Sequence, residues 1–319
     1  MRYPTQNTAI EAPPAVLLAH LSDIHLPHAR PPGLREINAK RLLGWANWRR
    51  NRVHVHTHGM LERIVADLRA QATDHIVVTG DLVNFGLPAE HAAALEWLRR
   101  LGPPDRVTVV PGNHDAYVRP RADAGIERWR EYMTSGGQDI GSTGAPAAAT
   151  RGGFPFVRRH GDVALIGVCS GVPTPLFMSA GRVGAVQADA LARLLAGCRA
   201  AGLARVVLIH HPPRAYAQAW RTGLSDWRRL RGVVRAEGAE LILHGHFHRH
   251  LRASIDGLTR AAPVIGVPSA SAAVAHKGDL AGYALYRLGL DGQQPTIELV
   301  RRGLRRPGGD IVEIERRML

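Results

Sequence analysis

Short apolar runs recur along the chain and predict a series of β-strands. The runs lie at residues 16–21, 74–79, 106–110, 162–169, 204–209, 240–243, 263–267 and 282–288. Most are nearly continuous rather than alternating, which is typical of strands that are buried on both faces. From residue 263 onward the connections are short, so we expect antiparallel hairpins in that part of the chain.

Helical periodicity fills the longer intervals between these runs. Apolar side chains repeat at the spacing of one helix face in residues 60–68, 95–101, 188–200 and 230–236. Strands that alternate with helices predict a layered α/β fold. We expect a single domain over residues 1–319, in which residues 1–14 form a polar tail.

Polar side chains follow five of the predicted strands at the point where each strand ends. The sequences there are SDIH (22–25), GDLVN (80–84), GNHD (112–115), HHPP (210–213) and GHFH (245–248). Ligands of α/β sheets bind at the carboxyl ends of the strands, and glycine lets the backbone approach a ligand closely. In an extended chain every second side chain points the same way, so His246 and His248 could face one target.

The chemistry of these side chains points to metal ions. Aspartate, asparagine and histidine supply oxygen and nitrogen donors, and neither Cys169 nor Cys198 belongs to the set. Such donors suit manganese, iron or zinc rather than a cysteine-based structural zinc site. About seven candidates are too many for one ion with open positions, which favours two ions that share a carboxylate. Each motif alone also fits a solvated loop, but five in order predict a site.

This ordered series resembles the pattern of the calcineurin-like metallophosphoesterase superfamily. The family pattern is D-x-H, G-D-x-x-D/N, G-N-H-D/E, a histidine after a strand, and G-H-x-H, and here it spans residues 23–248. The resemblance implies a four-layer α/β/β/α sandwich in which two mixed sheets pack together and helices flank them. It also implies a dinuclear metal centre of manganese, iron or zinc ions.

Carried over residue by residue, the resemblance implies seven metal ligands. The first ion takes Asp23, His25 and His248, the second takes Asn113, His210 and His246, and Asp81 bridges them. For the HHPP pair we favour His210, which directly follows the strand, with His211 as the alternative.

The resemblance also implies a catalytic role for His114, the histidine that contacts the substrate. Many family members that are protein phosphatases carry aspartate where this chain has Asn84, and that aspartate helps to orient the histidine. Asparagine cannot supply the charge. We take Asn84, Tyr117 and Arg119 as candidate substrate contacts, the last because arginine binds phosphate through paired hydrogen bonds.

The function expected from this resemblance is metal-dependent hydrolysis of phosphoester bonds, with a phosphodiester as the preferred substrate. Hydroxide that bridges the two ions would attack phosphorus in line with the leaving oxygen. His114 would stabilise the developing charge or protonate the leaving group. The alternatives are a nucleotide-lipid pyrophosphatase of the UDP-diacylglucosamine type, a cyclic nucleotide phosphodiesterase, a nuclease, and a scaffold without metal; the filled ligand positions argue against the last.

The charge of the chain favours an anionic partner. The formal net charge is +14, which fits phosphate esters, nucleic acid or acidic lipid, and equally an arginine-rich composition. Nucleic acid is the weaker expectation, because no compact basic block or aromatic platform is present. The chain has no apolar signal-peptide core and no apolar stretch of about 20 residues. We therefore expect a cytoplasmic protein, with peripheral contact at the inner membrane face as an alternative.

Two further stretches lie outside the family motifs. Residues 40–52, KRLLGWANWRRNR, combine leucine and tryptophan with basic residues. This composition fits a helix that packs over the sheet edge, or a lid that touches lipid and admits a lipid-linked phosphate ester. Three alternating histidines follow, His54, His56 and His58. They could be extra ligands, but they precede a helix-like pattern outside the family motifs, so we interpret them as surface or loop residues.

Overall fold

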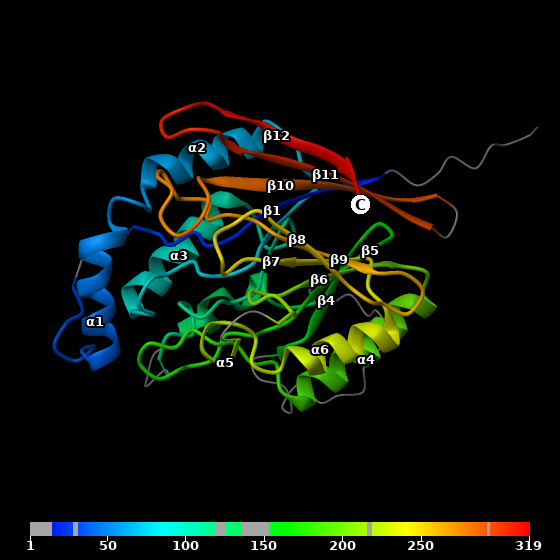
Figure 1. The fold of residues 1–319 in the computed structure, drawn as a ribbon, viewed down its shortest axis with the longest axis horizontal. Helices are drawn as coiled ribbons and strands as arrows, with labels where there is room; N and C mark the ends of the chain where they lie inside the picture. The colour runs from blue at the N-terminus through cyan, green and yellow to red at the C-terminus, as the bar shows by residue number, and fades with distance from the viewer. Residues whose placement is uncertain (1–14, 28–30, 119–124, 136–152, 216–218, 292–293) are drawn as a thin grey trace, which may run out of the picture.

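The computed structural model describes residues 15–27, 31–118, 125–135, 153–215, 219–291 and 294–319. Two six-stranded sheets form its centre (Figure 1). The first sheet has the order β12-β11-β10-β1-β2-β3 and consists of β1 (Val16–Leu21), β2 (His75–Val78), β3 (Val107–Val109), β10 (Gly282–Asp291), β11 (Gln294–Leu304) and β12 (Ile311–Met318). The second has the order β4-β5-β6-β7-β9-β8 and consists of β4 (Phe156–His160), β5 (Val163–Gly167), β6 (Ala204–Leu208), β7 (Leu241–His244), β8 (Leu251–Ile255) and β9 (Ala262–Gly266).

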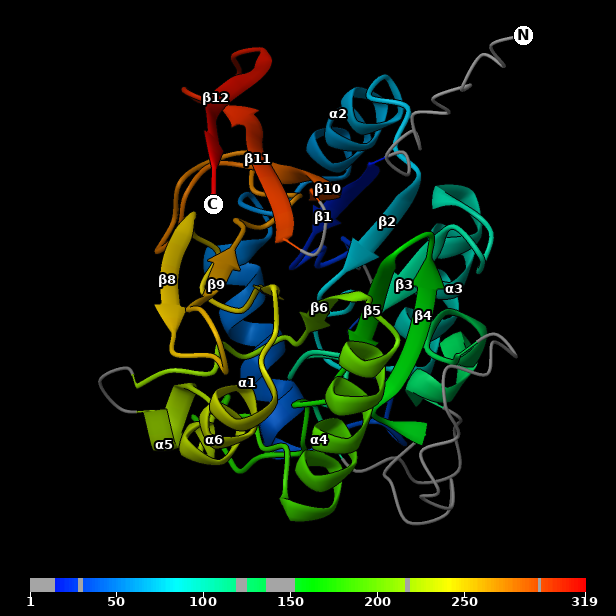
Figure 2. The ribbon, with the colours of Figure 1, turned by 90° about the vertical axis from the view of Figure 1, so that its right-hand side faces the viewer.

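Helices cover the outer face of each sheet. Helices α2 (His58–Arg69) and α3 (Pro88–Leu101) lie on the first sheet, and α4 (Ala185–Ala200) and α6 (Trp227–Glu237) lie on the second (Figures 1 and 2). The predicted four-layer α/β/β/α sandwich is confirmed. The remaining helical segments are α1 (Ala39–Asn47), the π-helical turn η1 (Trp48–Arg52), the 3₁₀ segment η2 (Gly125–Tyr132) and α5 (Ala219–Thr222).

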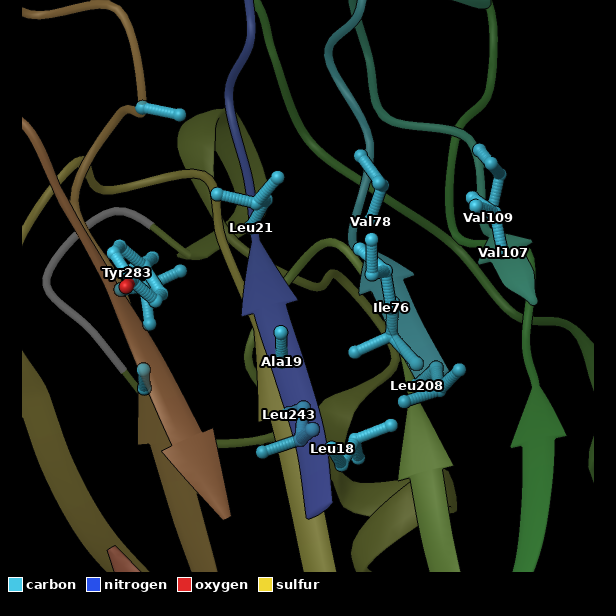
Figure 3. Packing of buried hydrophobic residues seen from close by; sticks show 14 of the residues in the cluster. Leu18, Ala19, Leu21, Ile76, Val78, Val107, Val109, Leu208, Leu243 and Tyr283 are labelled. Carbon is cyan, nitrogen blue, oxygen red and sulfur yellow. The ribbon is translucent and has the colours of Figure 1, made fainter. Parts of the chain in front are cut away.

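The main core lies between the two sheets. Leu18 and Ile76 of the first sheet belong to the same buried cluster as Leu208 and Leu243 of the second (Figure 3). Burial of an aliphatic side chain of this size contributes about 1.5–3 kcal/mol, so this layer holds the two sheets together. A second cluster fills the space between the second sheet and helices α4 and α6.

Strand direction brings the five motifs to one edge. β1, β2 and β3 are mutually parallel, and so are β5, β6, β7 and β9. The carboxyl ends of parallel strands share an edge, so the loops after β1, β2, β3, β6 and β7 meet at one end of the sandwich. Helix α1 lies at this end (Figure 1).

The expectation of antiparallel hairpins from residue 263 onward is confirmed, although β9 also has a parallel neighbour. β9 forms a hairpin with β8 and is parallel to β7 in the second sheet, and β10, β11 and β12 form an antiparallel meander in the first. The apolar runs also missed four strands, β4, β8, β11 and β12. β8 and β12 alternate between less and more exposed residues, since each has one face toward solvent, and this produces no continuous apolar run.

Candidate metal centre

The backbone of the strand-end loops is unusual where the candidate ligands lie. Asp23, His25, Asp81, His246 and His248 all have positive φ, between 43° and 74°, and they make up five of the eight non-glycine residues with positive φ in the described chain. Such conformations are uncommon outside glycine and concentrate at functional sites. They also mean that His246 and His248 do not lie on an extended strand, as the alternation had suggested.

Hydrogen bonds and close packing hold the loops against one another. The backbone N–H groups of Asp23 and His25 donate to the carbonyl oxygens of Gly80 and Asp81, each at 2.9 Å. A side chain at Gly112 would collide with Asp81, so only glycine fits at this close approach. The sequence therefore needs glycine beside the polar residue for the loops to meet.

Asp115 fixes the same loops through its carboxylate. It accepts backbone N–H groups from Asp81, Leu82, Val83 and Gly112 at distances of 2.7–3.2 Å. Burial and the nearby charge of Asp81 raise the pKa of Asp115 to about 7. Asp115 thus orients the two loops that carry Asp81 and Asn113.

The first group of candidate ligands lies between the ends of β1 and β7. The Nε2 atoms of His25 and His248 are 3.2 Å apart, and Nε2 of His248 is 3.1 Å from Oδ1 of Asp23. Asp23 and His25 are fully buried. Two side chains from the loop after β1 and one from the loop after β7 therefore bring donor atoms close together.

The second group lies beside it, at the ends of β3, β6 and β7. Oδ1 of Asn113 is 3.1 Å from Nε2 of His210 and 2.9 Å from Nδ1 of His246. Asp81 reaches both groups, because its Oδ2 is 3.4 Å from Nε2 of His210 and 3.9 Å from Nε2 of His25. This is the position that a shared carboxylate requires.

The HHPP pair divides into two different environments. Nδ1 of His210 bonds to the carbonyl oxygen of Thr79 at 2.7 Å, which leaves Nε2 to face Asn113 and Asp81. His211 uses Nδ1 on the hydroxyl of Ser170 and Nε2 on the carbonyl of Ser179, at 2.8 and 2.9 Å. Both ring nitrogens of His211 are engaged, so the geometry favours His210 as the ligand.

The donor set fits divalent ions. The donors are oxygen and nitrogen, and ligand atoms of Asp23, Asp81 and His210 lie within 4.8 Å of one another, which suits two neighbouring ions that share Asp81. Neighbouring ligands of a six-coordinate ion, each about 2.1 Å from it, lie about 3 Å apart, as these donors do. Oδ1 of Asp23 is buried, and its contact with Nε2 of His248 at 3.1 Å lacks hydrogen-bond geometry, so an ion would satisfy it.

The ionisation of the site also suits metal binding. Burial would raise the pKa values of Asp23 and Asp81, but nearby histidines, His248 for Asp23 and His210 for Asp81, outweigh it and hold both pKa values below normal. Burial lowers the pKa of His25 well below its usual value and that of His246 to about 3. These rings are neutral, as a metal ligand must be.

His114 lies beside both groups. Its backbone N–H donates to Oδ1 of Asp81 at 2.8 Å, and its ring is 4.9 Å from that of His25. Nδ1 bonds to the main-chain carbonyl of Asn84 at 2.6 Å, so Nδ1 carries the proton and Nε2 is an acceptor. Burial lowers the pKa of His114 to about 4, against the opposing effect of Asp81.

The other candidate substrate contacts have different surroundings. The side chain of Asn84 donates to the carbonyl of Leu26 at 2.8 Å and not to His114, so its lack of charge does not alter the bond that orients this ring. Tyr117 stacks on His114, with ring centroids 5.6 Å apart and an angle of 18° between the planes. Arg119 lies outside the described residues.

The surface interpretation of the alternating histidines is wrong for His56. Only 2% of His56 is exposed, and its ring is 4.7 Å from that of His25 and 5.6 Å from that of His248. His54 and His58 are exposed. The alternation could not have indicated this, since in an extended chain all three rings would share one face, whereas here the chain turns before His56 and enters α2 at His58.

Residues 40–52 form helix α1 followed by the π-helical turn η1. Lys40 ties α1 to the site, because Nζ donates to the carbonyls of Tyr117 and Thr174 at 3.0 and 2.9 Å. Trp48 is buried and packs with Phe85 and Leu87. The aromatic face therefore packs inward at Trp48, which excludes this tryptophan from a lipid contact.

The sequence reading also missed Arg52 as a site residue. Its guanidinium lies within 3.1–3.4 Å of ring nitrogens of His25, His56 and His114. Because Arg52 falls among other arginines in a basic stretch, the sequence alone did not distinguish it.

The fold and the two donor groups are those of a metal-binding phosphoesterase, and the comparison of the sequence with protein families agrees. A model of the calcineurin-like phosphoesterase family matches residues 16–250, most of the chain. The chain belongs to this family. Among curated proteins no sequence relative matches it.

Solved structures with this fold include two phosphatases. A dimetal phosphatase from Danio rerio aligns with a TM-score of 0.55 at 13% identity, over 95% of this chain and 99% of that one. A purple acid phosphatase from yellow lupin, Lupinus luteus, aligns with a TM-score of 0.54 at 11% identity, over 94% of this chain and 53% of that one. At such identities the likeness establishes the fold alone. No helix in the described part of the chain is long and apolar enough to span a membrane.

Proposed function

We propose that the protein is a dinuclear-metal-dependent phosphodiesterase. The observation that carries this proposal is the arrangement of two donor groups around Asp81, with His114 beside them. When bound, two divalent ions supply Lewis acidity that activates water and polarises phosphoryl oxygens for in-line displacement. We assign Asp23, His25 and His248 to one ion, Asn113, His210 and His246 to the other, and Asp81 to both.

The surrounding residues fix the protonation states that this chemistry needs. Asn84 holds the proton of His114 on Nδ1 through its main-chain carbonyl, so Nε2 faces the site. Nε2 is then the atom at which a proton is held or moved as the ester bond breaks. Tyr117 stacks on the ring and limits its rotation, which keeps Nε2 directed at the substrate.

The apolar residues around the site favour a substrate with organic groups on both sides of phosphorus. We call Leu42, Leu43, Phe177 and Trp220 the apolar rim; they are 49%, 47%, 72% and 67% exposed. Phe177 lies next to α5, because its carbonyl accepts a hydrogen bond from Nε of Arg221. Leu42 and Leu43 belong to α1, which Lys40 ties to the site. Trp220 belongs to α5, where the carbonyl of Thr222 bonds to Nε2 of His246. A phosphodiester can use such a rim, whereas inorganic and small monoester phosphates cannot.

Hydrolysis of model esters tests the proposal. Chelator-treated protein should not cleave bis-p-nitrophenyl phosphate, and manganese should restore cleavage, with this diester preferred over p-nitrophenyl phosphate. A cyclic nucleotide and a nucleotide-lipid pyrophosphate complete the panel and identify the substrate class. Full activity in metal-free protein would contradict the mechanism, and a preference for the monoester would contradict the diester assignment.

The apolar rim also supports a second candidate, hydrolysis of a lipid-linked phosphate ester at a membrane surface. Exposed leucine and tryptophan near basic residues suit the interface of an anionic membrane. Cosedimentation with vesicles that contain phosphatidylglycerol should fall for Leu42→Ser/Leu43→Ser and persist for Val186→Ser, which changes an exposed residue of α4. If the wild type ignores the vesicles, a soluble phosphodiester is the better substrate class.

A further inference from the structure

Arg52 places a guanidinium inside the candidate metal centre. Its Nη2 is 3.1 Å from Nε2 of His25 and 3.4 Å from Nε2 of His56, and its Nη1 is 3.3 Å from Nε2 of His114. Among the described residues no carboxylate forms an ion pair with Arg52. The side chain is thus a partly buried cation whose close polar neighbours are three imidazoles.

Such a cation calls for an anion. A charged group withdrawn from water is unfavourable unless it is paired and hydrogen-bonded. Asp23 and Asp81 are the acidic groups whose charges act on Arg52, and both already belong to the donor groups. Two divalent ions would add further positive charge beside the guanidinium. The site therefore has an excess of positive charge that an anionic ligand would neutralise.

The position of Arg52 is held from both sides. The turn that carries it contains a hydrogen bond from the N–H of Val53 to the carbonyl of Trp48, and Trp48 is anchored in its own apolar cluster. On the other side, Nδ1 of His56 bonds to the hydroxyl of Ser271 at 2.9 Å, so Nε2 of His56 faces the guanidinium. π-Helical turns are rare and often occur at functional sites.

Metal binding would free a donor of Arg52. If an ion takes the Nε2 lone pair of His25, the N–H of Arg52 that now faces this nitrogen loses its acceptor. A donor left without an acceptor in a buried place is unfavourable. The planar guanidinium matches two oxygens of a phosphoryl group, and charge assists these hydrogen bonds.

We propose that Arg52 binds a non-bridging phosphoryl oxygen of the substrate, and that His56 positions its guanidinium for this contact. The proposal rests on the phosphoesterase function proposed above and names one further substrate-binding residue in the same site. It places the oxygen at the N–H of Arg52 that now faces Nε2 of His25, next to the first donor group.

Binding of inorganic phosphate to manganese-loaded protein tests the assignment without turnover. Loss of charged hydrogen bonds of about 1.5–3 kcal/mol should weaken phosphate binding of Arg52→Ala by roughly 10- to 100-fold in calorimetry. Arg52→Lys keeps the charge but not the paired N–H donors of the guanidinium, and it should show an intermediate loss of phosphate affinity. Arg50→Ala, which changes an exposed arginine of the same turn, is the matched control and should bind as the wild type does.

Manganese content and thermal melting distinguish the outcomes. Both Arg52 variants should keep the wild-type metal stoichiometry. Unchanged phosphate affinity in Arg52→Ala, or loss of manganese from both Arg52 variants, would overturn the assignment. If the wild-type protein binds phosphate but cleaves no ester, the proposed function is contradicted instead. If Arg52→Ala fails to fold, the comparison of Arg52→Lys with Arg50→Lys decides.

Discussion

The two donor groups that share Asp81 differ in what surrounds them. In the second group, backbone carbonyls hold the outer ring nitrogens, with Thr79 bound to His210 and Thr222 bound to His246. In the first group, the carbonyl of Val83 likewise lies 3.3 Å from Nδ1 of His25, but the rings also face side chains from residues 52–56, a stretch that lies outside the family motifs.

This difference separates what the fold supplies from what this chain adds. Loops at the ends of the parallel strands enclose the second group, and His210 is fully buried. The first group has fully buried members too, Asp23 and His25, and each group has one partly exposed histidine. Arg52 and His56, however, enter the first group from outside the sheets. We therefore expect changes near the first group to alter substrate binding and changes in the second to alter metal retention.

The largest effect should come from the residue that both groups share. Asp81→Ala removes the carboxylate that reaches His25 and His210, so both positions lose affinity for manganese. We expect loss of bound metal and a fall in diester hydrolysis beyond about 10⁴-fold, of the size seen when an essential catalytic group is lost. Elemental analysis and a rate assay check this. The control is Asp189→Ala, which changes an exposed residue of α4. Retention of both ions would show that the two groups do not share this carboxylate.

A smaller effect should follow a change at His114, which contacts the first group without belonging to either. His114→Asn removes Nε2 but can keep a polar side chain near the carbonyl of Asn84. The rate should fall by about 10²–10⁴-fold, as for loss of a general acid or base, while the manganese content stays constant. Loss of metal with an unchanged melting temperature would instead place His114 among the ligands.

The smallest expected effect is that of pH on the affinity of the second group for manganese. Burial lowers the pKa of His210, but Asp81 outweighs it and raises the pKa to about 9 in the metal-free protein. Protonated imidazole cannot bind an ion, so binding below pH 9 must displace a proton, and affinity at this position should rise by up to about tenfold per pH unit. Manganese titrations at pH 7 and pH 8 measure this.

The same pKa fixes the sign of a stability effect in the metal-free protein. Because the folded pKa of His210 lies above its unfolded value of about 6.5, the stabilisation is complete below pH 6.5 and is lost as the pH rises to about 9. Thermal unfolding of metal-free protein should therefore shift to lower temperature between pH 7 and pH 9. His210→Asn should remove this dependence, and an unchanged pH profile in that variant would contradict the assignment.

The sequence predicted the strands that are buried on both faces and the helices between them. β1 lies at residues Val16–Leu21, as its apolar run indicated, and β6 and β7 differ from their runs by a residue. It missed the partly exposed β8 and β12, because a strand with one face in water alternates. The sequence could not predict which strands are neighbours, since short connections do not determine whether β9 pairs with β7 or with β10.

For the site, the sequence alone determined which donor types follow the buried strands, because a ligand at a strand end must be adjacent in the chain to that strand. Only the tertiary structure decided which of His210 and His211 faces Asn113, since that depends on which carbonyls lie behind each ring. It also brought Arg52 and His56 to the centre. Their place depends on the packing of a π-helical turn against distant residues, and no local pattern encodes such contacts.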